Sequence, residues 1–242
     1  MNKAFQFKHF LLKQDRSAQK MSTDSMLLGA IAELDGAMNI LDIGTGTGVV
    51  ALMMAQKHPE ALIDAVEIDM ESAKEANENF EASDWNYRLT VYHQRVQDFV
   101  EDETLHYDLI VSNPPYFERI QTQKGNNEEW PDERRLSART QNQLSFDALM
   151  ESVSKVLVSY GKFYVVIPHF AENELYEAGK HRGLYPVYRM EVAHDEKASP
   201  HRLVLAFAKN KSEIILDVLK IRNEEGGWSE NYKKLSADFH SK

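Results

Sequence analysis

The chain has 242 residues, of which 43% are hydrophobic, so it can build one large domain around a sizeable core. It contains no cysteine, which excludes a disulfide framework and a thiolate metal site and is compatible with the reducing cytoplasm. The net charge of −10 argues at first sight against a nucleic-acid partner. No apolar run approaches the ~20 residues that a helix needs to span a bilayer. We therefore expect a single domain over 1–242, cytoplasmic, with no membrane segment and no metal.

The N-terminal segment, residues 1–22, is basic, with five lysines and arginines against one acid. Phe5-Gln6-Phe7-Lys8 alternates as an edge strand does, and aromatic residues interleaved with bases can also stack on nucleobases and pair with phosphates. Both interpretations can hold together. A helix is predicted next over Met21–Leu34, with Thr23 or Asp24 as its N-cap.

The most informative stretch is Asn39–Gln56, where a short apolar run leads into three alternating glycines, Gly44, Gly46 and Gly48. A strand, a glycine loop and a helix begin a nucleotide-binding α/β unit, and glycine lets the backbone approach a ligand closely. The G-x-G-x-G spacing differs from the G-x-G-x-x-G of dinucleotide sites, which disfavours a nicotinamide cofactor. Asp42, just before the turn, can hold the loop amides or a ligand ammonium group.

The next predicted strand, Leu62–Ile68, carries an acid near its end. Glu67 lies 23 positions after Gly44, close to the ~20-residue offset at which a carboxylate meets a ribose diol. Asp69 is the competing candidate, and one of the two is expected to be the N-cap of a helix over Glu71–Phe80.

A third signal is the strand Leu109–Val111, which ends in Asn113-Pro114-Pro115-Tyr116. Two prolines cannot continue a central strand, so the chain must turn out at the carboxyl edge, where open α/β sheets bind ligands. Here the sequence resembles the class I S-adenosylmethionine-dependent methyltransferases that methylate exocyclic or amide nitrogens. The glycine loop, Glu67 and the tetrad occur in the usual order of that family.

The resemblance implies roles for further residues. Thr23-Asp24-Ser25-Met26-Leu27-Leu28-Gly29 matches a segment that, in the family, closes over the methionine part of S-adenosylmethionine. Asp98 occupies the place of an acid that accepts from the adenine amino group of the cofactor, with Phe99 as the apolar neighbour. A helix cap is the alternative role for Asp98.

The tetrad suits attack by a weakly nucleophilic amino nitrogen. Asn113 can accept one N–H of the target amino group through its side-chain oxygen, and Pro114 can accept the other through its carbonyl. These bonds free the nitrogen lone pair, and the rate then depends mainly on alignment. Tyr116 offers a face for an unstacked base, and Phe117 offers a second apolar contact.

After the tetrad, residues 118–144 form a polar stretch that we interpret as a lid or substrate loop. Helices are then predicted over Phe146–Tyr160, ended by Gly161, over Asn173–His181 and near Ser229–Phe239. Strands are predicted over Leu89–Tyr92, before the tetrad, and over Lys162–Ile167, Leu184–Val192, Leu203–Ala208 and Ile214–Ile221 after it. This order predicts an α/β fold with a seven-stranded, mostly parallel sheet and helices on both faces, and the resemblance implies its class I methyltransferase, Rossmann-like form. An eighth strand can come from the N-terminus or the C-terminal tail.

The tetrad alone leaves the target open among adenine N6, other base nitrogens and a glutamine amide. Only 38 residues precede Asn39, too few for the helical domain of the glutamine enzymes, and no large DNA-recognition insertion is present. Guanine N2 enzymes tend to have Phe where Tyr116 stands. The chain resembles, over nearly its full length, the bacterial valine-tRNA adenine-37 N6-methyltransferases, which implies a tRNA substrate. A non-catalytic cofactor-binding protein and a nicotinamide oxidoreductase are the other classes, and both conflict with the tetrad.

Charge is distributed unevenly. Residues 1–22 and 180–211 each carry +4, whereas residues 23–179 carry −17. We expect RNA to be held by these two basic segments, with only the target base entering the acidic cofactor edge. Ordinary solvated charge is the alternative. The oligomeric state is open, with a monomer as the default. The residues expected to grip RNA are Lys8, Lys13, Arg16, Lys20, Arg182, Arg189, Lys197 and Arg202.

Overall fold

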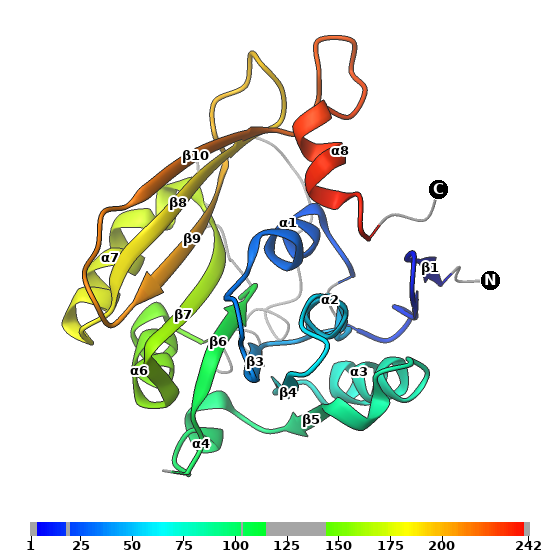
Figure 1. The fold of residues 1–242 in the computed structure, drawn as a ribbon, viewed down its shortest axis with the longest axis vertical. Coiled ribbons are helices and arrows are strands. Elements are labelled where there is room, and N and C mark those ends of the chain that lie inside the picture. Colours follow the sequence, from blue (N-terminus) through cyan, green and yellow to red (C-terminus); the bar gives the residue numbers. More distant parts are fainter. Residues whose placement is uncertain (1–3, 18–19, 103, 115–143, 240–242) are drawn as a thin grey trace, which may run out of the picture.

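A computed structural model of the chain describes residues 4–17, 20–102, 104–114 and 144–239. Its centre is a twisted sheet whose strands run in the order β10-β8-β9-β7-β6-β3-β4-β5 (Figure 1). Neighbouring strands are parallel throughout, except that β9 runs antiparallel to β7 and β8. The strands are β3 (Asn39–Ile43), β4 (Leu62–Glu67), β5 (Leu89–His93), β6 (Tyr107–Ser112), β7 (Leu157–Pro168), β8 (Tyr185–Ala193), β9 (Arg202–Ala208) and β10 (Ile215–Lys220).

The mostly parallel sheet confirms the predicted fold class, and its eighth strand is β10, from the C-terminal part of the chain. The N-terminal residues do not join this sheet. Instead, β1 (Phe5–Gln6) pairs antiparallel with β2 (Leu11–Leu12) in a separate two-stranded sheet. Phe7 stacks on Phe10 with ring centroids 4.2 Å apart, so two of the N-terminal aromatics are buried in the core.

Helices cover both faces of the sheet (Figure 1). One face packs against α1 (Thr23–Ile31), α2 (Val49–Lys57), α3 (Met70–Glu81) and α8 (Glu230–Ser236), and the other against α4 (Val96–Phe99), α6 (Phe146–Val156) and α7 (Glu172–His181). The structure also has two short 3₁₀ turns. η1 (Asn86–Arg88) precedes β5, at the edge where the parallel strands begin, and η2 (His169–Ala171) follows β7, at the edge where they end. Within the described ranges, no helix combines the length and apolarity needed to cross a membrane.

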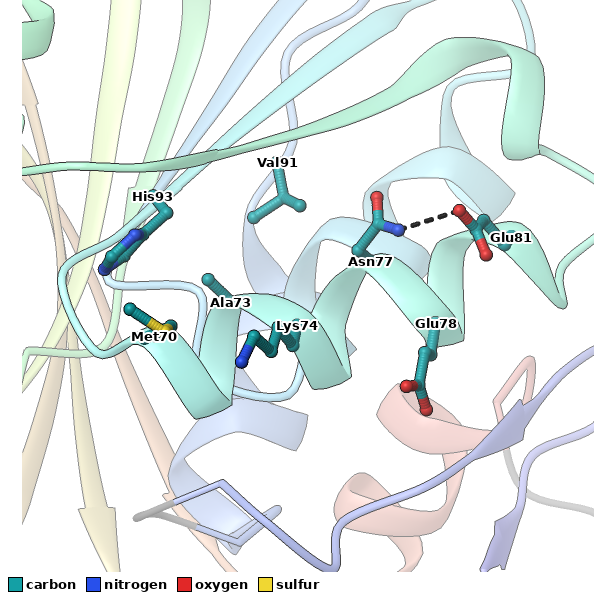
Figure 2. Close-up of a pocket in the computed structure, with 8 residues that line it drawn as sticks. All are labelled: Met70, Ala73, Lys74, Asn77, Glu78, Glu81, Val91 and His93. Atoms are coloured by element: carbon teal, nitrogen blue, oxygen red, sulfur yellow. Dashed lines mark hydrogen bonds between the residues drawn. The ribbon is translucent and has the colours of Figure 1, made fainter.

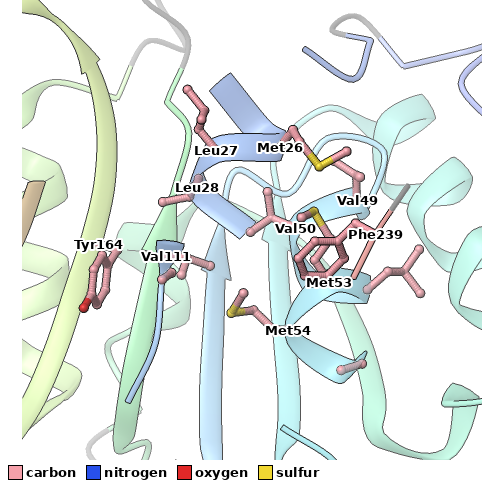
Figure 3. Packing of buried hydrophobic residues seen from close by; sticks show 14 of the residues in the cluster. Met26, Leu27, Leu28, Val49, Val50, Met53, Met54, Val111, Tyr164 and Phe239 are labelled. Atoms are coloured by element: carbon pink, nitrogen blue, oxygen red, sulfur yellow. The ribbon is translucent and has the colours of Figure 1, made fainter. Parts of the chain in front are cut away.

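The packing of α1 on α2 fixes the helix that follows the glycine loop. Figure 3 shows Met26 of α1 near Val49 and Val50 of α2, with Met53 of α2 and Phe239 of the C-terminal tail close by. All are buried, and each such side chain contributes roughly 1.5–3 kcal/mol by leaving water. The C-terminal tail therefore closes the core beside α2, far from it in sequence.

Three predicted boundaries were wrong. The N-cap of α1 is Ser22, whose hydroxyl accepts from the amide of Ser25 in a capping box, rather than Thr23 or Asp24. The helix from Phe146 ends at Val156 instead of Tyr160, because Leu157 already pairs with Tyr107 of β6. Gly161 consequently lies inside β7, where a Cβ atom would come 2.8 Å from the carbonyl oxygen of Asp108. It allows a close strand approach and does not end a helix.

Candidate active site

The glycine loop and the tetrad meet at one point of the sheet. The chain leaves β3 toward β4 and β5 and then returns to the other side of β3 as β6, so a topological switch point lies between β3 and β6. Ile43 is level with Ser112 in the register, and the Ser112 hydroxyl donates to the Ile43 carbonyl at 2.9 Å. Gly44 and Asn113, the next residues on the two strands, therefore leave the sheet side by side.

The loop needs glycine for two separate reasons. Gly44, Gly46 and Gly48 all have positive φ, at 71°, 56° and 81°. Gly48 is also tightly packed, because a Cβ atom there would lie 2.5 Å from Cε1 of Phe80. A Cβ atom at Gly44, by contrast, would meet no atom of the described residues within 4 Å. The start of the loop thus borders open space, as a ligand site requires.

Asp42 is buried beneath the loop and anchors it. One carboxylate oxygen accepts from the Thr45 hydroxyl at 2.6 Å and from the Ala51 amide of α2 at 3.2 Å. Burial raises the pKa of Asp42 to about 7, with the nearby Glu67 charge adding to the rise and the two hydrogen bonds opposing it. Asp42 is expected from the sequence to hold the loop amides or a ligand ammonium group. In the structure, its carboxylate links the loop residue Thr45 to the Ala51 amide of α2.

This burial predicts a pH effect on stability. Because the pKa of Asp42 is raised from 3.8 to about 7 by folding, the folded protein should lose stability as pH rises through that interval. Asp42→Asn keeps an acceptor oxygen for Thr45 and Ala51 but cannot ionise, so its stability should fall less over the same range. Urea unfolding midpoints of both proteins at pH 5 and pH 7.5 measure this difference. Equal shifts in the two proteins would contradict it.

Glu67 lies at the end of β4 and supports the same loop. Its Oε2 accepts from the Gly46 amide and its Oε1 from the Asp69 amide, both at 2.9 Å, and its side chain is largely buried. Asp69 is instead the N-cap of α3, accepting from the amide and hydroxyl of Ser72 at 2.8 and 2.7 Å. The structure thus gives the capping role to Asp69, and Glu67 becomes the candidate for a ribose diol.

Glu75 and Asn79 on α3 hold the N-terminal segment against the site, which sequence reasoning missed. The Glu75 carboxylate accepts from the amides of Asp15, Arg16 and Ser17 at 2.6, 2.9 and 2.7 Å. A Cβ atom on Gly46 would lie 3.8 Å from the Ser17 hydroxyl, so this segment reaches the glycine loop. The only sequence signal was that Glu75 and Asn79 fall on the apolar side of a helix, alongside Ala76.

Asn79 completes this connection. Its side-chain amide donates to the carbonyls of Lys13 and Thr47 at 2.9 and 2.8 Å, and its oxygen accepts from the Lys13 amide. One buried side chain thereby joins the N-terminal segment, α3 and the glycine loop.

The other residues predicted to bind the cofactor are Thr23 and Asp24 on α1 and Asp98 and Phe99 on α4. Asp24 in the first turn of α1 accepts from Nε of Arg202 at 3.0 Å, and Thr23 is exposed. Asp98 is exposed on α4, whose N-cap is Arg95, so the alternative capping role is absent. Phe99 is 5% exposed and packs against the ring of Tyr92 with centroids 5.0 Å apart.

Two residues of the tetrad, Asn113 and Pro114, belong to the part of the chain that the structure describes. Asn113 is half-buried and Pro114 is buried directly after β6. Pro115, Tyr116 and Phe117, and residues 118–143 of the predicted lid, lie outside the described residues. Their roles stay predictions.

The expected RNA-gripping residues are not brought together on one surface. Lys13 and Arg16 form ion pairs with Glu78 of α3, and Arg182 pairs with Glu151 at the amino edge of β8, opposite the glycine loop. Arg189 binds Glu172 and Glu191. Lys8, Lys20 and Lys197 are exposed, and Arg202 lies at the edge that carries the tetrad.

A surface pocket of about 640 Å³ lies between α3 and β5 (Figure 2). Its lining mixes Met70 and Val91 with charged side chains such as Lys74 and Glu78, and Asn77 donates to Glu81 within it. It includes neither the glycine loop nor Asn113, so it is separate from the site described above. In the described part of the chain, no group of three or more acidic or histidine side chains is arranged to hold a metal ion.

The fold and this site define a class I methyltransferase. A family model described as "Methyltransferase small domain" matches residues 17–129. A solved structure of a predicted O-methyltransferase from Agrobacterium tumefaciens is similar with a TM-score of 0.69 and 17% identity, covering 89% of this chain and 96% of that one. This similarity concerns the fold alone.

Curated relatives are more specific. The tRNA1(Val) (adenine(37)-N6)-methyltransferase of Citrobacter koseri is 39% identical, covering 98% of this chain and 94% of its own length. The protein of the same name from Flavobacterium johnsoniae is also 39% identical, covering 98% and 99%. The chain belongs to the tRNA1(Val) (adenine(37)-N6)-methyltransferase family.

Proposed function

We propose that the protein transfers a methyl group from S-adenosylmethionine to N6 of adenine 37 in a valine tRNA, in the cytoplasm. The observation that carries this is the juxtaposition of Gly44 and Asn113 at the switch point between β3 and β6. It sets a nucleotide-binding loop beside a residue suited to accept hydrogen bonds from a planar amino group. Membership of the family supplies the expected target.

The residues present fit the proposed cofactor. The loop from Gly44 to Gly48 presents backbone beside open space, and Glu67 stands next to it. Each carboxylate oxygen of Glu67 holds one backbone amide, and a carboxylate has about four acceptor positions, so acceptors remain for a diol. When bound, S-adenosylmethionine supplies an electrophilic methyl group on its sulfonium centre.

Asn113 prepares the target nitrogen. The adenine amino group is a weak nucleophile because its lone pair is delocalised into the ring. The Asn113 side-chain oxygen and the Pro114 carbonyl oxygen would each accept one N–H, which localises the lone pair on nitrogen. Both acceptors are neutral, and alignment of the nitrogen with the methyl group is the main source of rate. Tyr116 is the proposed stacking surface for the base.

The test is incubation of the protein and cofactor with total RNA from a strain that lacks the gene, followed by nucleoside mass spectrometry. N6-methyladenosine should appear in the tRNA fraction. Methylation confined to ribosomal RNA would instead support another target of the same tetrad, and no methylation of any RNA would contradict the proposal.

The proposed RNA grip predicts a salt effect. Each phosphate contact that is lost should lower the single-strand salt slope by ~0.7 and weaken binding to all sequences alike. RNA binding at several salt concentrations should be compared for Lys8/Lys13→Ala and Arg182/Arg189→Ala. Both Arg182 and Arg189 are occupied by acids, whereas in the N-terminal pair only Lys13 is, by Glu78, so the N-terminal pair should give the larger change. Wild-type slopes in both variants would show these residues to be solvated surface.

A further inference from the structure

The end of β7 lies directly beside the tetrad. β6 and β7 run parallel with Ser112 level with Val165, so Asn113 leaves the end of β6 next to the last residues of β7. The chain then leaves β7 at Pro168 into the η2 turn, His169–Ala171. η2 therefore stands next to the point where the target nitrogen is proposed to bind.

Phe170 in this turn is largely exposed. Its relative exposure is 68%, whereas the next residue, Ala171, is 5% exposed. Burying an aromatic side chain of this size would contribute a large apolar area to the core, so its exposure is costly to the isolated protein. An exposed aromatic ring at the ligand-binding edge of the sheet is suited to contact a planar partner.

A basic side chain, Arg202, adjoins this turn. Pro168 is level with Arg202 at the start of β9, and the His169 amide donates to the His201 carbonyl at 3.1 Å. Arg202 donates through Nε to Asp24 and through Nη1 to the His201 carbonyl, and no described residue accepts from its Nη2. Burial and the Arg202 charge lower the pKa of His201, so the positive charge here comes mainly from Arg202.

Three carboxylates near η2 are already engaged, whereas Glu174 in the first turn of α7 is exposed to solvent. Glu172 and Glu191 bind the guanidinium of Arg189, and Glu191 also lies 3.9 Å from Nε2 of His169. Asp195 accepts from the amides of Lys197 and Ala198. The other half of the edge, over β3, β4 and β5, carries the acids Asp42 and Glu67 at the cofactor site. An anionic backbone is accommodated better on the η2 side than on that side.

We propose that Phe170 is a stacking platform for a nucleobase that flanks the target adenine, with Arg202 binding the adjoining phosphate. The inference rests on the proposed function, since it concerns the same RNA substrate. It places the RNA strand across β7 and β9, with the target base turned toward Asn113. Phe170 is thus a substrate-binding residue that acts by stacking and has no part in the chemical step.

The first experiment compares steady-state methylation of a valine tRNA anticodon stem-loop by wild type, Phe170→Ala and Phe170→Tyr. Stacking lost on alanine substitution should raise KM for RNA roughly 5- to 150-fold, while the tyrosine variant should stay near wild type. The Kd for S-adenosylmethionine should not change. Tyr87→Ala is the matched control, because Tyr87 is 74% exposed on η1 at the opposite edge of the sheet.

A second experiment separates stacking from a structural role. Stem-loops with an abasic site on either side of the target adenine are tested with wild type and Phe170→Ala. If Phe170 stacks on a flanking base, one abasic site should raise KM for wild type but cause little further rise in the variant. Additive effects at both positions, or an unchanged KM in Phe170→Ala, would overturn the inference. A wild-type protein that methylates no stem-loop would instead contradict the proposed function.

Discussion

Asn113→Ala is expected to lower kcat for methyl transfer by about 10²- to 10³-fold or more, the loss typical of removing one preorganised hydrogen-bonding group. The affinity for S-adenosylmethionine should stay nearly unchanged, because Asn113 addresses the target nitrogen. Single-turnover methylation of tRNA measures the rate, and calorimetry measures cofactor binding.

Asn113→Asp is the matched variant, since it keeps an acceptor oxygen at the same position. It should retain more activity than Asn113→Ala if hydrogen-bond acceptance is the role of this side chain. Near-wild-type turnover in Asn113→Ala would remove the proposed mechanism. Weakened cofactor binding in that variant would move Asn113 from the target to the cofactor.

The second large effect is expected at Glu67. Glu67→Ala should weaken S-adenosylmethionine binding by ~1.5–3 kcal/mol, the usual contribution of hydrogen bonds to a charged group. Because Glu67 also holds the amides of Gly46 and Asp69, part of this loss comes from a loosened loop. Thermal unfolding of the free protein should be measured beside the calorimetric Kd to separate the two contributions.

Asp69→Asn is the control for Glu67. Asp69 caps α3 through Ser72, and asparagine is an equally good N-cap, so this variant should keep both stability and cofactor affinity. If Asp69→Asn loses affinity while Glu67→Ala does not, the ribose contact belongs to Asp69.

Local patterns were enough to predict the fold class and the chain turns at which the candidate site lies. The alternation of Gly44, Gly46 and Gly48 after an apolar run, and the prolines after Val111, mark chain turns that depend only on nearby residues. Both turns could be placed at the carboxyl edge of the sheet, because open α/β sheets bind ligands at that edge. The strand order, which sets Asn113 directly beside the glycine loop, came from the structure.

Long-range pairing is what the sequence could not show. Asp24 and Arg202 are 178 positions apart and form an ion pair in the structure. The sequence predicts instead that Asp24 binds the cofactor and that Arg202 binds RNA. The clamp of Glu75 on Asp15, Arg16 and Ser17 also needs a tertiary contact, because a helical glutamate is usually solvated. Net charge by segment likewise hid the ion pairs of Arg182 and Arg189.

The protein is proposed to methylate one adenine at a site built on Gly44, Glu67 and Asn113. The most direct measurement uses valine tRNA transcripts with adenosine or guanosine at position 37, treated with wild-type protein and labelled S-adenosylmethionine. We predict N6-methyladenosine in the first transcript and no label in the second. Equal labelling of both transcripts, or none in either, would contradict the claim.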